Sequence, residues 1–111
     1  MNLTKADYVR KVLDAYRQTP GAGVIHHNDR LLAAVLYQRG VPVTAVENAM
    51  LLAASRRIFR SPTAAPLQPI RSLHYFLSVI DEVLKGQVSP DYFAYLRFHI
   101  DRHLKKSYPA D

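Results

Sequence analysis

The stretch from Ala45 to Arg60, AVENAMLLAASRRIFR, constrains the fold more than any other part of the chain. When its first ten positions are placed at helical pitch, only Glu47 and Asn48 interrupt an apolar surface that runs nearly all the way round. A helix without a polar face is usually surrounded by other helices. We therefore expect this segment to form the centre of a helical core.

The same stretch ends in the densest cationic cluster of the chain. Arg56, Arg57 and Arg60 fall inside one arc of roughly 100° at helical pitch. Guanidinium groups suit phosphate oxygens and also stack on bases. Contacts of this kind would give affinity with little sequence information. The alternative is that these arginines cap their helix and hold the following proline-rich linker through its carbonyl groups.

The distribution of charge along the chain shows that the cationic cluster lies in a longer region without acidic residues. The net charge is +6, and no carboxylate occurs from Asn48 to Ile80. Arg71 and His74 lie in this acid-free region beyond the linker, and the arginines would converge if the two ends approached each other. Such a region suggests a polyanionic partner, nucleic acid first. Solvated arginines on an ordinary small basic protein would give the same composition.

Helical periodicity and capping signals predict where the helices of the chain begin and end. Thr4 is a candidate N-cap, as are Asn28 and Thr44, and Thr44 stands at capping-box spacing from Glu47. In the second helix, an apolar stripe is expected at Leu31, Leu32, Val35 and Leu36. The expected helices run over about 5–18, 29–39, from between 42 and 45 to about 60, 70–85 and 90–106.

Residues 61–69, SPTAAPLQP, carry three prolines and cannot form a helix or a central strand. We expect a semi-extended linker with Leu67 tucked against the surface. No strand-period alternation occurs in the sequence. The prediction is an all-α fold, a compact bundle of about five helices that forms one domain over residues 1–111.

The last predicted helix has an outer face that mixes aromatic and basic residues. Phe93, Leu96, Ile100 and Leu104 make its buried stripe, and the opposite side carries Tyr95, Phe98, Arg102, Lys105 and Lys106. Phe98 should be exposed unless another chain covers it. Aromatics interleaved with bases are typical of single-strand stacking platforms. They are equally typical of a homodimer or partner interface, with Tyr95 and Phe98 as interface residues.

A helix-turn-helix is a further interpretation, because Gly40 separates two predicted helices. The second of these begins Ala45-Val46-Glu47-Asn48, so only Glu47 and Asn48 could address bases. A helix as apolar as this one is poorly suited to a DNA groove.

Little in the sequence points to enzymatic chemistry. There is no cysteine, which excludes a thiolate nucleophile or metal ligand and fits a reducing compartment. His99 and His103 share a helix face, but they lack the intervening glutamate and further ligand of a hydrolytic zinc site. We expect no enzymatic activity, no metal and no cofactor. The charged first eleven residues and the lack of a long apolar run predict no signal peptide and no membrane span, hence a cytoplasmic protein.

The segment from Asp29 to Leu84 resembles the C-terminal helical domain of the DnaD/DnaB-type primosome proteins. The resemblance rests on Val46-Glu47-Asn48-Ala49 after a glycine turn and on Phe76-x-x-x-Ile80-x-x-x-Leu84, where leucine takes the place of the family's tryptophan. It implies DNA binding by basic residues near the end of the motif helix, and assembly with replication proteins. The sequence is also similar in character to small accessory proteins of bacterial mobile elements.

Together these observations predict a non-enzymatic nucleic-acid-binding accessory module in bacterial DNA replication or mobile-element maintenance. Its partners would be single- or double-stranded DNA and a replication protein. The phosphate-binding residues are expected to be Arg56, Arg57, Arg60, Arg71, Arg102, Lys105 and Lys106. The alternatives are a protein-interaction or homodimerisation module that uses the last helix, and a helix-turn-helix repressor.

Overall fold

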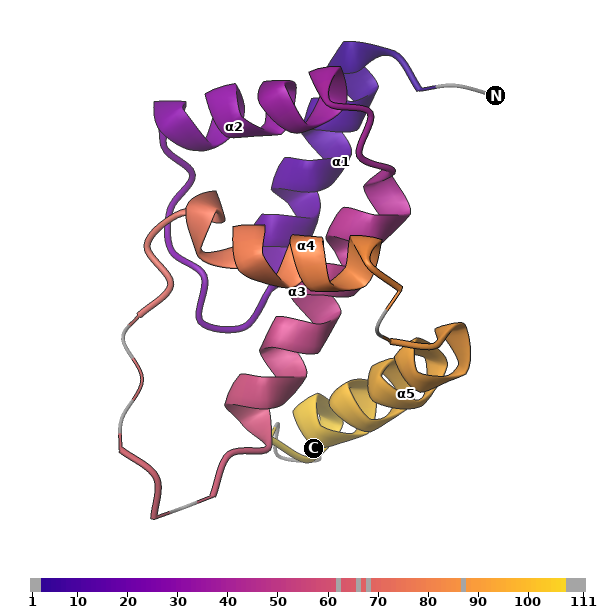
Figure 1. The fold of residues 1–111 in the computed structure, drawn as a ribbon. Helices are drawn as coiled ribbons and strands as arrows, with labels where there is room; N and C mark the ends of the chain where they lie inside the picture. The colour runs from indigo at the N-terminus through magenta and orange to yellow at the C-terminus, as the bar shows by residue number, and fades with distance from the viewer. Residues whose placement is uncertain (1–2, 62, 66, 68, 87, 108–111) are drawn as a thin grey trace.

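Helix α3, Val43–Ile58, lies at the centre of the fold, with the other elements arranged around it (Figure 1). The structure is a computed structural model that describes residues 3–61, 63–65, 67, 69–86 and 88–107, with side chains described as far as residue 102. The other elements are α1 Lys5–Gln18, α2 His27–Gln38, the short 3-10 helix η1 Leu73–Phe76, α4 Leu77–Leu84 and α5 Pro90–Ser107. The all-α prediction of about five helices is confirmed.

The central position of α3 follows from its sequence. The helix packs against α1, α4, α5 and η1. Ala45, Ala49 and Ala53 are buried, and such small side chains let neighbouring helices approach closely. Residues of all five helices and η1 contribute to one hydrophobic cluster, in which the largest fully buried side chains are Tyr16 and Phe76.

Helix α1 has the bounds that its local signals predict. The hydroxyl of Thr4 accepts a hydrogen bond from the backbone N–H of Asp7 at 3.1 Å and caps the first turn. The helix ends before Thr19, whose N–H bonds to the carbonyl of Tyr16. Its buried face consists of Tyr8, Val12, Leu13 and Tyr16.

Helix α2 begins earlier than predicted. Its N-cap is His26, not Asn28, and Asp29 stands three residues later with its carboxylate bonded to the N–H of His26 at 2.8 Å. This is the backward half of a capping box. The predicted apolar stripe is also partly wrong, because Leu31 and Val35 are exposed while Asp29 is buried.

Helix α3 starts directly after Pro42, which is its N-cap residue. The prediction of a Thr44–Glu47 capping box is therefore wrong, because both residues lie inside the helix. Gly40 has a φ of +74°, in the left-handed region that glycine adopts without penalty, so it ends α2 as expected.

The predicted helix over 70–85 is shorter in the structure, because η1 and α4 begin only at Leu73. Ile70 instead forms an isolated parallel bridge with Ala22 and is buried. It anchors the chain where Leu67 was expected to do so; Leu67 is 40% exposed, so that expectation is wrong. No other strand-like pairing occurs in the described ranges.

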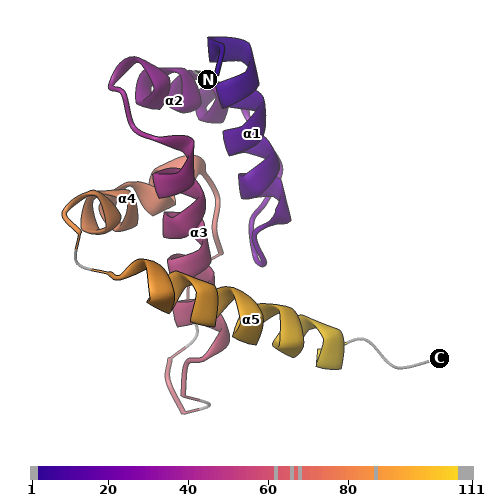
Figure 2. The same cartoon turned by 90° about the vertical axis from the view of Figure 1, so that its right-hand side faces the viewer.

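Helix α5 runs past the C-terminal part of α3, and its second half extends beyond the other helices (Figure 2). Ser89 accepts a hydrogen bond from the N–H of Tyr92 through its hydroxyl, as an N-cap before Pro90 should. Phe93, Leu96 and Ile100 are buried as predicted, and the Leu104 side chain lies outside the described residues. Within the described part of the chain, no helix has the length and apolar character to cross a membrane.

Candidate nucleic-acid interface

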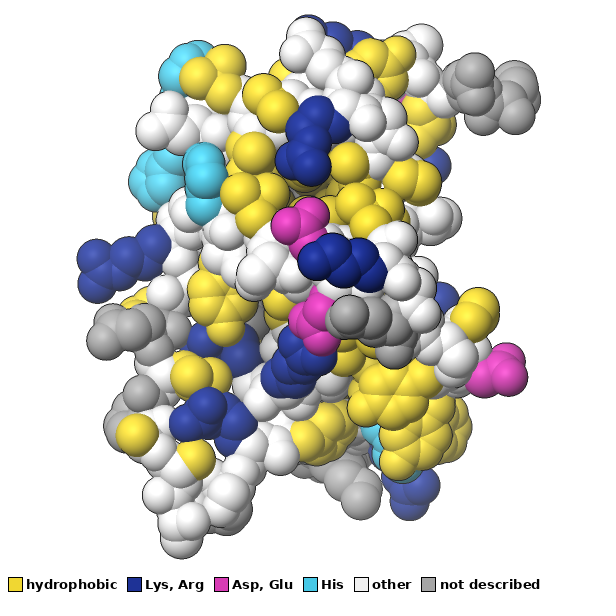
Figure 3. Space-filling view, in the orientation of Figure 1, with side chains coloured by type: hydrophobic (Ala, Val, Ile, Leu, Met, Phe, Trp, Pro, Cys, Tyr) yellow, Lys and Arg dark blue, Asp and Glu magenta, His cyan; other side chains and the backbone are white. Residues whose placement is uncertain are grey.

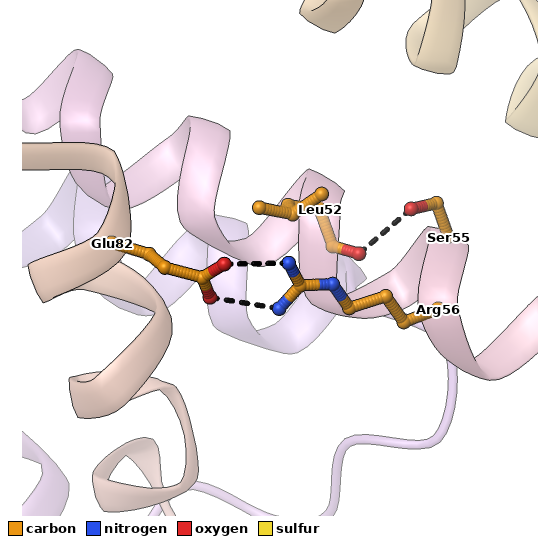
Figure 4. A network of polar contacts seen from close by, with 4 residues as sticks. All are labelled: Leu52, Ser55, Arg56 and Glu82. Atoms are coloured by element: carbon orange, nitrogen blue, oxygen red, sulfur yellow. Dashed lines mark hydrogen bonds and ion pairs between the residues drawn. The ribbon is translucent and has the colours of Figure 1, made fainter. Parts of the chain in front are cut away.

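The guanidinium of Arg56 forms a two-pronged ion pair with the carboxylate of Glu82 on α4 (Figure 4). Nη1 donates to Oε2 at 2.8 Å and Nη2 donates to Oε1 at 2.7 Å. This parallel arrangement is the strongest geometry that an arginine and a carboxylate can form. The pair joins the end of α3 to α4, and the positive charge of Arg56 is balanced.

The ion pair shifts the pKa values of both groups in the directions that favour their charged forms. The hydrogen bonds from Arg56 lower the pKa of Glu82, and those to Glu82 raise the pKa of Arg56. Both groups are therefore charged at neutral pH. Because both side chains also face solvent, the pair acts mainly by fixing where the guanidinium lies.

Arg57 points in another direction, toward η1 and the loop after α1. Its Nη1 donates to the hydroxyl of Tyr75 at 3.2 Å, and its guanidinium carbon lies 5.7 Å from the centre of the Tyr75 ring. Gly21 lies beside it, since a Cβ on that glycine would be 3.5 Å from Arg57 Nε. Arg57 therefore ties the end of α3 to two segments that precede and follow it in the chain.

Arg60 holds the connection that follows α3. Its Nη2 donates to the backbone carbonyl of Ala65. The interpretation of the arginines as holding the linker is therefore correct for Arg60. Arg60 is otherwise exposed, and one hydrogen bond to a neutral carbonyl leaves its charge unbalanced.

The four arginines consequently do not converge on one point. Arg56 faces α4, Arg57 faces η1 and Arg60 faces the connection. Arg71 and Arg102 are exposed and make no hydrogen bond or ion pair with other described residues. Lys105 and Lys106 belong to α5, and their side chains lie outside the described residues.

The acid-free part of the sequence forms a coherent region of the surface. In Figure 3, dark blue side chains lie among white and yellow ones at the lower left, over the end of α3 and the connection after it, and no magenta side chain is visible there. The magenta acidic side chains lie elsewhere in this view, including over α4. Folding changes the charge pattern of the sequence at Arg56, which Glu82 neutralises, and keeps it over the connection.

A second feature is an exposed aromatic row on α5. Tyr92, Tyr95 and Phe98 are 45%, 57% and 60% exposed. The rings of Tyr92 and Tyr95 are stacked, with centroids 6.0 Å apart and planes inclined by 19°. The ring of His99 follows, 4.2 Å from that of Tyr95. In Figure 3, a patch of yellow side chains lies at the lower right, over α5.

This row borders a hollow of about 400 Å³ between the end of α3 and α5. From α3 it is lined by Ser55, Arg56 and Phe59, and from α5 by Tyr92, Tyr95, Leu96 and His99. Phe98 is not among the lining residues. We call this hollow the aromatic groove. It places the guanidinium of Arg56 beside exposed rings of another helix.

Of the residues that line the groove, sequence reasoning named Arg56 and Tyr95 as site residues but not Tyr92, His99 or Phe59. Tyr92 and His99 could have been found, because they share a helix face with Tyr95 at spacings of three and four. Phe59 and Glu82 had no local signal. Glu82 is 26 positions from Arg56, and only the packing of α4 on α3 brings the two together.

The position of α3 bears on the helix-turn-helix interpretation. Half of the helix is buried, including Val46, Ala49 and Met50 in its first half. A recognition helix must present an exposed face to the major groove. In the first half of α3 only Thr44 and Glu47 are exposed, so its accessible face is narrow, and the geometry gives this interpretation no support.

The described side chains contain no group of three or more His, Cys, Asp or Glu that could hold a metal ion.

Comparison with protein-family models, with curated proteins and with solved structures finds no match to this chain. The resemblance to the primosome proteins therefore stays a prediction based on sequence.

Proposed function

We propose that this protein is a non-enzymatic nucleic-acid-binding module whose exposed arginines contact phosphates. The observation that carries the proposal is the surface over the connection after α3, where Figure 3 shows basic side chains and no acidic ones. Glu82 balances the charge of Arg56, but Arg60 has no carboxylate partner among the described residues, so a polyanion that approaches Arg60 meets unbalanced positive charge. The sequence resemblance favours a role as an accessory protein in bacterial DNA replication or mobile-element maintenance, in the cytoplasm and alongside a replication protein.

The arginines differ in how well they suit phosphate contacts. Arg60, Arg71 and Arg102 are exposed and have no carboxylate partner among the described residues, so they are the leading candidates. Arg57 contributes charge beside Tyr75. Arg56 is the weakest candidate for a phosphate, because Glu82 already occupies two of its donors. Lys105 and Lys106 extend the basic end of α5 in sequence.

The test is the salt dependence of DNA binding by the Arg60→Ala/Arg71→Ala double variant. Each lost phosphate contact lowers the slope of log K against log salt by about 1, so a reduction of about 2 is expected. An Arg39→Ala variant is the control, since this exposed arginine follows the last residue of α2, at the opposite end of that helix from Asp29 and the segment that contains Arg71 (Figure 1). Equal slopes for wild type, test and control variants would overturn the assignment.

The exposure of Tyr95 and Phe98 favours one second candidate, a protein interface such as a homodimer through α5. Sedimentation of the wild type and of Phe98→Asp tests it. A dimer that the substitution converts to monomer would support this candidate. A wild type that remains monomeric at high concentration would eliminate the homodimer.

A further inference from the structure

We infer that the aromatic groove receives an unstacked nucleobase, so that this protein binds single-stranded nucleic acid in preference to duplex. The inference rests on the proposed function and adds to it the substrate class and the place where bases are held. It gives the exposed rings of α5 a role distinct from that of the phosphate-binding arginines.

Aromatic rings line both walls of the groove. Tyr92 and Tyr95 stack on each other, and His99 continues the row at 4.2 Å from Tyr95. Phe59, which is 51% exposed, lies on the opposite wall. A base entering between the helices therefore finds ring surfaces on both sides. Stacking of this kind is tolerant of sequence, because every base has a π-face.

Arg56 gains a function from its ion pair. Glu82 fixes the guanidinium plane where it lines the groove, and it balances the charge. A planar guanidinium whose edge is engaged by a carboxylate still has two open faces, and guanidinium faces stack on aromatic rings. Arg56 is thus placed to contact a base rather than a phosphate.

The groove discriminates between strand types for a geometric reason. Bases in a duplex are stacked on their neighbours and paired, so only their edges are accessible in the grooves. An aromatic groove needs a base that has left the stack, which single strands provide. The exposed Arg102, three residues after His99 on α5, lies close enough along the helix to contact the backbone of the same strand.

A protein partner would be expected to use a different centre. The most exposed apolar ring of α5 is Phe98, and it does not line the groove. The lining combines rings with polar groups, namely the tyrosine hydroxyls, His99 and Arg56. This composition suits nucleobases, which have apolar faces and polar edges.

The experiment compares three labelled probes of equal length at one low salt concentration: oligothymidylate, an oligomer of abasic tetrahydrofuran nucleotides, and a duplex. The first two carry the same phosphates and differ only in their bases. Stacking contributes about 1–3 kcal/mol for each base, so oligothymidylate should bind about tenfold or more tightly than the abasic oligomer. It should also bind more tightly than the duplex.

Single substitutions test whether the preference for bases comes from the aromatic groove. Tyr95→Ala should weaken oligothymidylate binding about tenfold and leave abasic binding unchanged. Phe98→Ala is the matched control, because it removes an equally exposed ring of the same helix from outside the groove. Since the chain contains no tryptophan, its intrinsic emission comes from tyrosine, and oligothymidylate but not the abasic oligomer should quench it. Circular dichroism confirms that each variant is folded.

The outcomes separate the two proposals. Equal affinity for oligothymidylate and the abasic oligomer, or tighter binding of the duplex, would overturn the base-binding groove and leave phosphate binding in place. A weaker Phe98→Ala with an unchanged Tyr95→Ala would also overturn it. No binding of any probe would refute both the groove and the proposed function.

Discussion

The carboxylate of Asp29 accepts a hydrogen bond at 2.9 Å from the backbone N–H of Leu73, 44 positions later in the chain. Its other oxygen accepts from the N–H of His26 at 2.8 Å, and the side chain is fully buried. One acidic residue therefore satisfies the starts of two helices, α2 and η1. Free N–H groups at helix starts favour a negative charge, and here a single carboxylate meets two of them.

Substitution of Asp29 by alanine should lower the free energy of unfolding by about 3 kcal/mol, because the buried N–H of Leu73 and the partly buried N–H of His26 lose their acceptor. Asp29→Asn keeps one acceptor oxygen and should lose about half as much. Urea unfolding followed by circular dichroism measures both. If Asp29→Ala unfolds at the wild-type urea concentration, the two hydrogen bonds do not contribute as described.

Two buried tyrosines form a matched pair for the same measurement. The hydroxyl of Tyr8 donates to the carbonyl of Val41 at 2.7 Å, whereas that of Tyr16 makes no hydrogen bond with the described residues. Tyr8→Phe should cost about 1 kcal/mol, and Tyr16→Phe should be neutral or stabilise by up to about 1 kcal/mol. Equal losses in both variants would contradict this difference.

Alkaline pH should destabilise the fold. Burial raises the pKa of both Tyr8 and Tyr16, and the nearby charge of Asp29 raises that of Tyr16 further. The unfolded chain ionises its tyrosines near pH 10, so the folded state loses stability as the pH rises above that value. Tyr16→Phe should show a smaller loss between pH 9 and about 11. The exposed Tyr95→Phe is the control, and an identical pH profile for all three proteins would contradict the prediction.

Loss of the ion pair between Arg56 and Glu82 should make the fold less stable at acidic pH, in contrast to the tyrosines, which act at alkaline pH. Because Arg56 lowers the pKa of Glu82, the contribution of the pair is present at neutral pH and is lost as the pH falls through that lowered pKa. Glu82→Gln should therefore melt at a lower temperature than wild type at pH 7, and the difference should shrink as the pH is lowered into the acidic range. Asp81→Asn, a neighbouring exposed carboxylate, is the control. A difference that persists unchanged at acid pH would exclude this account.

Local signals in the sequence predicted the fold well where the causes are local. Helix α1 matches its predicted bounds because Thr4 caps it and Thr19-Pro20 ends it. The start of α2 is also local, since the N–H of His26 bonds to Asp29, but that capping pair was not recognised. The start of η1 and α4 was missed for a different reason, because Leu73 bonds to Asp29 and Ile70 bridges to Ala22, which are both distant in the sequence.

The same distinction applies to the candidate site. The exposure of Phe98 follows from its place opposite the buried stripe of α5, and the structure agrees. The hydrogen-bond partners of the arginines could not be predicted from helical spacing. Arg56 and Arg57 are adjacent in sequence, yet one bonds to Glu82 and the other to Tyr75, because each faces a different neighbouring element.

The arrangement of α2 has a consequence for how the molecule opens. Helix α2 packs on α1 and η1, whereas α3 is enclosed by α1, α4, α5 and η1. Helix α2 can therefore detach as a cooperative unit while the centre of the molecule stays closed. Its amide protons should exchange with solvent before those of α3. The bond from Asp29 to Leu73 contributes to the free energy of that partial opening, so Asp29→Ala should accelerate exchange in α2 more than in α3.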